Sequence, residues 1–316
     1  MRYRCGGIIN KTVAGIRPAM RTGPKDGLAF WLDEQLAEEK MALKDILVHV
    51  DRTEVCSERV RVSAQLAARH DAHLTGLYAI PSPYIPTIED YAQLPADYIE
   101  EQISSAKNEA AEAEAGFRQA AEAVGVAFEW RCEQGHPGEI VRTHARYCDL
   151  LVLGQHDPDA SFNSGDLPDG VLLTVGRPVL IIPYAGHVES LGERVMVGWD
   201  SGTSATRAVH DALPLISDAN HVDIIAVNPQ GSGDHGEIPC ADISLHLARH
   251  GITAEAQSIA VTDIGIADIL LSRAADKGID LFVMGAYGHS RWRELVLGGV
   301  TAHMLEHMTM PVLMAH

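Results

Sequence analysis

Four glycines near the end of the chain have a spacing that suits phosphate binding. Gly285 and Gly288 follow the apolar run 281–284, and Gly298 and Gly299 open an expected last helix. A glycine has no Cβ, so a ligand can come close to its backbone. The first N–H groups of a helix lack intrahelical partners and bind anions. The stretch therefore predicts a phosphate-binding loop, whereas a lone pair of these glycines would indicate only a turn and a cap.

Alternating strands and helices would place this loop at one edge of a parallel sheet. Apolar runs of strand length predict a first set of strands at 45–51, 73–80, 126–135, 150–155 and 178–183. The same order recurs in strands at 194–200, 221–229, 253–261, 281–288 and 311–316. Helices are expected between them at 57–72, 96–123, 137–148, 201–219, 242–251 and 264–278. This repeat predicts an α/β fold with two tandem, doubly wound parallel-sheet domains.

The repeat also predicts how the chain divides. We expect a first domain over 41–184 and a second domain, which holds the glycine loop, over 192–316. Residues 1–40 lack the strand–helix alternation, so we expect them to form a loose extension. A start codon assigned too far upstream would give the same pattern, and both explanations stay open.

Composition and charge exclude several classes of protein. The formal net charge is −18 with 25 basic residues, which disfavours binding to nucleic acid or to anionic lipid. No stretch approaches the roughly 20 apolar residues of a membrane span, and no signal peptide is evident. The five cysteines are scattered, as in reduced proteins. We therefore expect a cytoplasmic protein that associates with neither nucleic acid nor membranes.

The glycine loop resembles the signature of the universal stress protein family, G-x2-G-x9-G-[S/T] after the fourth strand. Gly285, Gly288 and Gly298 match it, and the segment that ends in HMTMPVLMAH continues the match. The resemblance covers 45–183 and 194–316, so the chain is similar to a tandem member of the family. It implies an ATP-binding protein of the stress response, with Mg accompanying the nucleotide, that assembles into dimers or other homo-oligomers.

The resemblance also implies a set of contacts with the nucleotide. Asp200 would meet the adenine–ribose end, Val227 would hold adenine through its backbone, and Met284 would cover it. The residues implied for ribose and phosphates are Gly285, Gly288, Gly298, Gly299, Val300 and Thr301. An aspartate after a buried strand also suits a second role, because Asp200 could instead cap the next helix.

Gly299 departs from the family pattern, in which ATP-binding members carry Ser or Thr. A charge-assisted hydrogen bond from a hydroxyl is worth about 1.5–3 kcal/mol, or roughly ten- to a hundredfold in affinity. The backbone N–H remains, and Thr301 lies two residues further on. We therefore expect weakened rather than abolished binding of ATP.

The N-terminal copy of the loop is degenerate. Asp157 stands where the second glycine belongs, and Asp159, Asp166 and Asp169 follow it. A side chain and several negative charges would oppose phosphate by both sterics and repulsion. Prolines interrupt any resemblance to a calcium loop, so we expect this half to bind neither ATP nor metal.

The remaining patterns do not indicate catalysis. His303 and His307 lie in an HxxEH pattern, but the few residues that follow them leave little room for a third zinc ligand. His246 and His250 lack the accompanying glutamate. A dehydrogenase would need its glycines after the first strand. We therefore expect a nucleotide-responsive binding protein with, at most, slow ATP hydrolysis; the alternative is a nucleotide-independent stress scaffold of the same fold.

Overall fold

A computed structural model describes residues 42–80, 96–156, 167–227, 240–260, 265–287 and 299–316. Contacts group the chain into two units, Met1–Ala42 and Leu43–His316. The predicted extension 1–40 lies outside the described residues and stays a prediction. The second unit carries all the elements described below.

The N-terminal half of this unit alternates strands and helices as the sequence predicted. Its elements are β1 (Asp45–Val50), α2 (Cys56–His70), β2 (His73–Ile80), α4 (Ala96–Val124), β3 (Phe128–Gln134), α5 (Pro137–His144), β4 (Leu150–Gly154), α6 (Asp169–Leu172) and β5 (Val179–Ile182). A short 3-10 turn at Ala145–Tyr147 follows α5. The four-residue helix α6 was not predicted.

The C-terminal half repeats this order. Its elements are β6 (Arg194–Gly198), α7 (Thr203–Ile216), β7 (His221–Val227), α8 (Ala241–Arg249), β8 (Ala254–Ile259), α9 (Ile266–Lys277), β9 (Leu281–Gly285), α10 (Gly299–His307) and β10 (Val312–Ala315). Gly278 ends α9 in the left-handed conformation (φ 61°), where a residue without a Cβ is favoured. None of the helices in the described ranges is long and apolar enough to cross a membrane.

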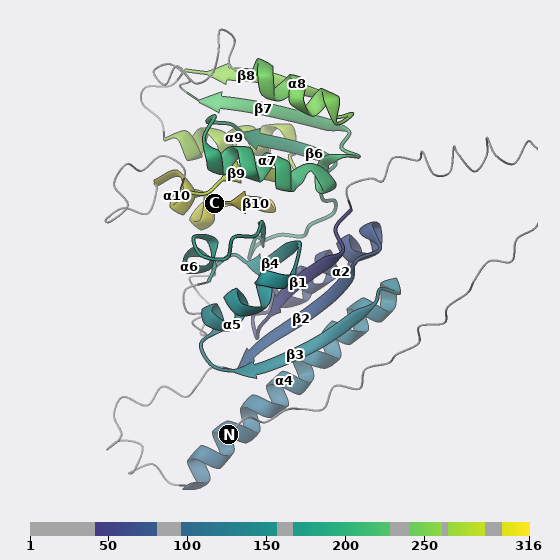
Figure 1. Ribbon diagram of the computed structural model, residues 1–316. Coiled ribbons are helices and arrows are strands. Elements are labelled where there is room, and N and C mark those ends of the chain that lie inside the picture. The colour runs from purple at the N-terminus through teal and green to yellow at the C-terminus, as the bar shows by residue number, and fades with distance from the viewer. Residues whose placement is uncertain (1–41, 81–95, 157–166, 228–239, 261–264, 288–298) are drawn as a thin grey trace, which may run out of the picture. The chain divides into compact units, whose positions relative to one another are not determined.

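The ten strands form one sheet in the order β3-β2-β1-β4-β5-β10-β9-β6-β7-β8 (Figure 1). Neighbouring strands within each half are parallel. In each half the first strand lies between the second and the fourth, which is doubly wound topology. The predicted fold class is therefore confirmed.

The last strands of the two halves pair with each other. β5 and β10 run antiparallel, with Val312 opposite Ile181 and Met314 opposite Val179. Each strand is a short apolar run at the edge of its half, and an exposed edge of that kind invites a partner strand. The pairing covers both edges.

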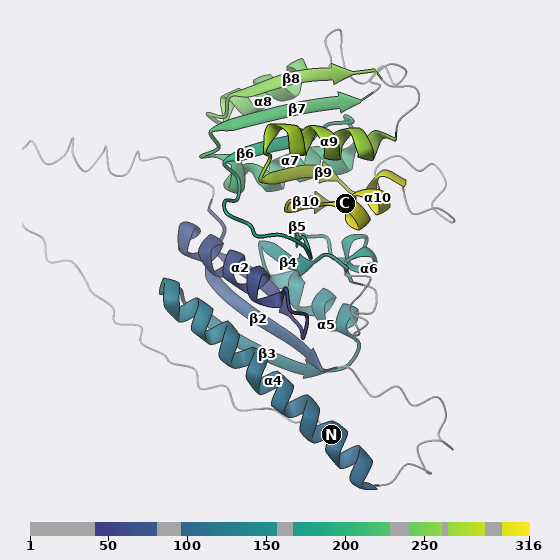
Figure 2. The same cartoon turned by 180° about the vertical axis from the view of Figure 1, so that it is seen from behind.

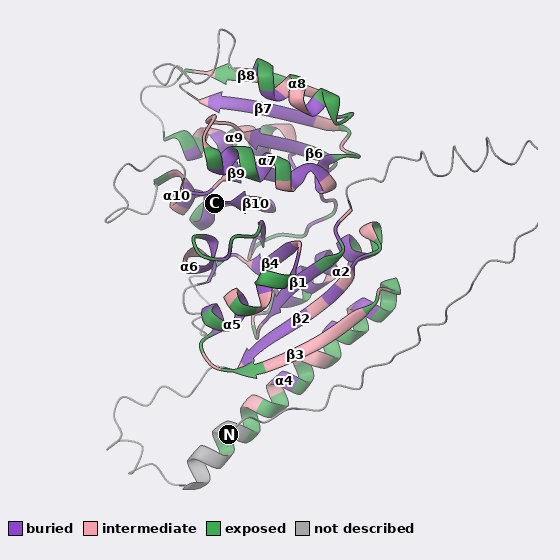
Figure 3. Cartoon of the chain, in the orientation of Figure 1, coloured by how far each residue is buried: buried purple, intermediate pink, exposed green. Residues whose placement is uncertain are grey.

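Two hydrophobic cores cover the two faces of the sheet (Figures 2 and 3). Ile46 and Val48 of β1 point into the core that α2, α4, α7 and α8 cover. Leu47 between them points into the other core, with residues of α5, α6, α9 and α10. Since strands of a parallel sheet are buried on both faces, they read as continuous apolar runs.

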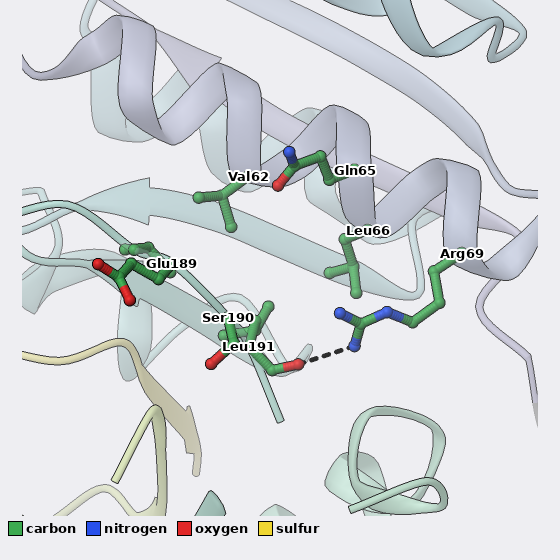
Figure 4. A pocket seen from close by; sticks show the side chains of 8 residues that line it. Val62, Gln65, Leu66, Arg69, Glu189, Ser190 and Leu191 are labelled. Atoms are coloured by element: carbon green, nitrogen blue, oxygen red, sulfur yellow. Dashed lines mark hydrogen bonds between the residues drawn. The ribbon is translucent and has the colours of Figure 1, made fainter. Parts of the chain in front are cut away.

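The segment between the halves is held from both sides. Arg69 of α2 donates from Nη1 to the carbonyl oxygen of Leu191 over 2.8 Å, beside a small pocket (Figure 4). On the other side the carboxylate of Asp280 accepts the hydroxyl of Ser190 and three backbone N–H groups, those of Gly192, Glu193 and Arg194. The linker is therefore a fixed part of the fold.

Candidate functional site

The carboxyl ends of β6, β7 and β9 meet at one edge of the sheet. Gly198 of β6 pairs with Ile225 of β7 and with Met284 of β9. Asp200 and Val227 each lie two residues beyond their paired positions, so both reach this edge. In open α/β sheets, ligands bind at such an edge, where the strand order reverses. The register therefore brings together the strand residues that the sequence assigned to the adenosine end.

Asp200 lies in the turn between β6 and α7. Its Oδ1 accepts the backbone N–H of Gly202 over 2.8 Å, and Gly202 is the residue that caps α7. Asp200 is therefore not the N-cap residue of α7 itself, but its side chain holds the residue that is. Asp200 is partly buried, and its place at the carboxyl edge of the sheet suits the predicted adenine–ribose contact.

Val227 and Met284 differ in how open they are. Val227 ends β7, pairs with Ile259 of β8 and is partly buried. Met284 is 6% exposed and packs in the core on the α9 and α10 face. A backbone contact from Val227 to adenine needs no side chain to move. Met284 could cover adenine only with the part of its side chain that lies at the carboxyl edge of the sheet.

Gly285 is required by packing as well as by any ligand. A Cβ at this position would collide with the backbone N of Ala205 and with Ser204, in the first turn of α7. The helix therefore lies directly against the end of β9. Close packing of helix on strand is a known reason for glycine in nucleotide-binding turns.

The start of α10 faces the same edge of the sheet. Gly299 is exposed, and a Cβ there would meet nothing within 4 Å, while Val300 is partly buried. Thr301 is 3% exposed, and its Oγ1 accepts the backbone N–H of Tyr287 over 3.1 Å. Thr301 thus ties the first residues of the glycine loop to α10. Gly288 and Gly298 lie outside the described residues.

A buried charged cluster lies at the corresponding edge of the N-terminal half. Nη2 of Arg59 is 2.8 Å from Oδ2 of Asp51, and Nδ1 of His49 is 3.7 Å from the same oxygen. Asp51 also accepts the N–H and the hydroxyl of Thr53. Arg59 was not predicted as a site residue. It lies on the buried stripe of α2, together with Cys56, Val60 and Ser63.

The environment of the cluster sets its charges. Burial lowers the pKa of His49 from 6.5 to about 4, against the attraction of Asp51, so this imidazole is neutral near pH 7. Burial alone would raise the pKa of Asp51, but Arg59, His49 and the Thr53 hydrogen bonds outweigh it and hold the pKa well below its usual range. The Asp51–Arg59 pair is therefore ionised although both side chains are buried.

One group of potential metal ligands occurs among the described residues. His221, Asp223 and Glu255 lie on one face of β7 and β8, with ligand atoms within 4.8 Å of one another. The ammonium of Lys277 is 2.5 Å from Oδ1 of Asp223, and His221 is 3.0 Å from Oδ2. Asp223 is fully buried, and Lys277 supplies the cation that its carboxylate needs.

The two histidine pairs are also accounted for by local contacts. Nε2 of His303 is 2.8 Å from Oδ1 of Asp268 on α9, and its ring packs edge-on against that of His307. The rings of His246 and His250 pack in the same way. The cysteines in the described ranges form no disulfide with one another; they are Cys56, Cys132, Cys148 and Cys240.

Comparison with known families matches both halves of the chain. The model of the universal stress protein family matches residues 42–183 and again 192–316. Two universal stress proteins of Synechocystis sp. are similar in sequence. The first is 25% identical over 189 residues, 52% of this chain and 57% of the relative. The second is 30% identical over 127 residues, 36% of this chain and 80% of the relative. The match thus spans little more than half of the first relative.

Solved structures share the fold over both halves. A universal stress protein from Archaeoglobus fulgidus matches with a TM-score of 0.65 and 19% identity, over 86% of this chain and 97% of that protein. A protein described as functionally unknown, from Pseudomonas aeruginosa, matches with a TM-score of 0.52 and 15% identity, over 87% of this chain and 92% of that protein. At these identities the likeness concerns the fold.

Proposed function

Because the chain belongs to the universal stress protein family, in which it matches twice, we propose that its C-terminal half binds one adenine nucleotide. The chain then works in the stress response as a nucleotide-responsive binding protein of the cytoplasm that forms homo-oligomers. Its cofactor is ATP, accompanied by Mg and held weakly. Hydrolysis, if measured, is slow.

The observation that supports this most is the meeting of three strand ends with one helix start. Asp200 and Val227 lie beyond paired positions of β6 and β7, and Gly285 ends β9 beside them. The hydroxyl oxygen of Thr301 accepts the backbone N–H of Tyr287 and so holds α10 close to the end of β9. The unpaired N–H groups and the positive dipole end of α10 then face the edge where phosphates belong.

Each proposed contact follows from this arrangement. Adenosine lies at the ends of β6 and β7, with Asp200 accepting from ribose or adenine and the Val227 backbone holding the base beside Met284. The phosphates lie against Gly285 and the start of α10, at Gly299 and Val300. Gly288 and Gly298 complete the loop on the evidence of the sequence alone.

Isothermal titration of the full chain with Mg-ATP tests the proposal. We expect one site per chain, and loss of binding in Gly288→Val, whose side chain fills the space that the phosphates need. Gly116→Val is the matched control, because a Cβ at Gly116 in α4 meets nothing within 4 Å. Two sites per chain, or binding that survives Gly288→Val, would contradict it.

A nucleotide-independent scaffold is the second candidate, and Gly299 is the observation that favours it. Nucleotide that copurifies with the chain, released by denaturation and read by its ultraviolet absorbance, separates the two. If titration with Mg-ATP gives no heat for either the natural chain or Gly299→Ser, the result would support the scaffold.

A further inference from the structure

The two halves carry different residues at one equivalent helix position, which lies beside the candidate nucleotide site. Ile46 pairs with Leu150 and Val48 with Val152, whereas Val195 pairs with Leu281 and Val197 with Val283. These pairs make Asp51 the counterpart of Asp200, and Gly154 the counterpart of Gly285. In α2 and α7 the buried positions then coincide: Arg59, Val60, Ser63, Ala64, Leu66 and Ala67 correspond to Ala208, Val209, Ala212, Leu213, Leu215 and Ile216.

Arg59 is therefore the counterpart of Ala208. Both residues are buried, but the methyl group of Ala208 ends at the helix surface, while the Arg59 guanidinium reaches the edge of the sheet. It lies 2.8 Å from the Asp51 carboxylate, and a Cβ added to Gly154 would collide with its Nη1. The guanidinium thus lies between the ends of β1 and β4, where the strand order of this half reverses.

We infer that Arg59 is the residue that closes the N-terminal half to a nucleoside, because its guanidinium occupies the place beside Asp51 that adenosine would need. This inference rests on the proposed function for its identification of Asp200 as the adenosine-end residue. It adds a reason why the N-terminal half does not bind at the nucleoside end of its site, and this reason does not depend on any phosphate contact.

The Asp51 carboxylate is already engaged by three donors from the described residues. Besides Arg59, it accepts the N–H and the hydroxyl of Thr53 over 3.0 and 2.6 Å, and its side chain is 7% exposed. A nucleoside would have to break a buried ion pair to reach it. Breaking such a pair is strongly unfavourable and corresponds to about a hundredfold or more in affinity.

Packing alone gives no reason for an arginine at this position. The side chain is 2% exposed, and its Nε makes no hydrogen bond to any described residue, although buried donors are rarely left without a partner. Ala208 shows that an apolar residue serves the same position in the other half. What Arg59 adds is a charge and a volume placed at the strand ends.

Equilibrium dialysis of the full chain against labelled adenosine tests the inference. Adenosine carries no phosphate, so the acidic loop of the N-terminal half does not affect the outcome. We expect one molecule per chain for the natural protein and two for Arg59→Ala. The double variant Arg59→Ala with Asp51→Asn leaves no unpaired buried charge. It should also bind two, the second more weakly than in Arg59→Ala, because an amide has one acceptor oxygen in place of the two of the carboxylate. Arg59→Met removes the charge but keeps the volume, and should bind one.

Free guanidinium ion gives an independent readout. In Arg59→Ala it should compete with the second adenosine and leave the first in place, because it fits the space that the side chain vacated. Adenosine binding that stays at one per chain in both alanine variants would overturn the inference. So would a second adenosine in Arg59→Met, or failure of both alanine variants to fold while Arg59→Met folds, since the guanidinium volume would then be needed only for packing.

The same experiment separates the inference from the proposed function. No adenosine in the natural chain and one in Arg59→Ala would support the inference while contradicting nucleotide binding by the C-terminal half. One adenosine in both proteins would leave the proposed function intact and overturn the inference.

Discussion

Single glycines of the predicted loop have different reasons to be glycine. At Gly285 any Cβ would collide with the first turn of α7, so packing alone requires it. At Gly299 a Cβ would meet no described residue within 4 Å, so the described part of the structure tolerates a side chain. The family departure at Gly299 is therefore a matter of ligand chemistry rather than of fold.

Gly299→Ser should bind Mg-ATP about tenfold more tightly, because it restores one charge-assisted hydrogen bond to phosphate. Isothermal titration of the variant and the natural chain measures this. Gly285→Ser is the matched control and should lose thermal stability through its collision with α7. Equal affinity of Gly299→Ser and the natural chain would show that position 299 does not reach the phosphates.

His49 makes stability depend on pH. Its pKa falls from 6.5 to about 4 on folding because of burial, so the unfolded chain takes up a proton first as the pH drops. Stability from this group is complete above pH 6.5 and is lost toward pH 4, by up to about 3 kcal/mol.

Denaturant unfolding at a series of pH values checks this effect. His49→Gln should flatten the decline between pH 6.5 and 4, whereas His156→Gln, at an exposed position, should leave it unchanged. Parallel curves for the natural chain and His49→Gln would show that His49 does not contribute.

At the scale of elements, apolar runs and the proline and glycine residues that bound them predicted nearly every helix and strand. The runs predicted the strands because both faces of the sheet are buried, and Pro137 and Gly278 marked a helix start and a helix end. The missed helix α6 has only four residues, too few to show a period. Arg59 was missed because a charged residue in a helix is normally assigned to its solvated face, and only the packing of α2 on β4 reveals otherwise.

The candidate site divides in the same way. The sequence predicted the strand ends, since residues that follow paired strands must share an edge. It could not predict that Thr301 would bond to Tyr287, nor that Asp280 would organise the linker. Both are side-chain contacts with backbone groups that become neighbours only once the strands have paired.

Asp280→Asn should lower the stability of the linker and of the chain. The carboxylate accepts four hydrogen bonds from Ser190, Gly192, Glu193 and Arg194, and an amide has one oxygen to offer. We expect a loss of about 2 kcal/mol, measured as a melting temperature lower by a few degrees. Asp276→Asn, on an exposed position of α9, is the control and should change little.

At the scale of the whole molecule, the halves are joined by strand pairing, by shared hydrophobic cores and by side-chain contacts such as that of Gln155. β5 and β10 complete the sheet across the two halves. Gln155, the residue after β4, reaches from the N-terminal half to the carbonyl oxygens of Leu305 and Glu306 at the end of α10. The helix proposed to hold phosphate at its start is therefore held by the other half at its end.

Val312→Lys should disrupt the joint between the halves. Val312 is fully buried and pairs with Ile181, and an unpaired buried ammonium is strongly unfavourable. Thermal unfolding with light scattering should show a lower melting temperature or a changed oligomeric mass. Ser258→Lys, at an exposed position of the edge strand β8, should change neither. Equal behaviour of the Val312 variant and the natural chain would contradict the pairing.

Gln155→Ala tests whether the hydrogen bonds from Gln155 to the end of α10 affect the binding of the nucleotide. The amide is 6% exposed, donates to two carbonyls and accepts the N–H of Tyr184 over 3.0 Å. Its loss removes three hydrogen bonds, of which the one to Leu305 is buried. We therefore expect about 2–3 kcal/mol of destabilisation and Mg-ATP binding weakened a few-fold, because α10 is held less firmly. Gln65→Ala, at an exposed position of α2, should alter neither melting temperature nor affinity. Weakened ATP binding without any loss of stability would contradict a contact that acts by holding the helix in place. A stability unchanged by Gln155→Ala would show that the hydrogen bonds of Gln155 do not help to join the halves.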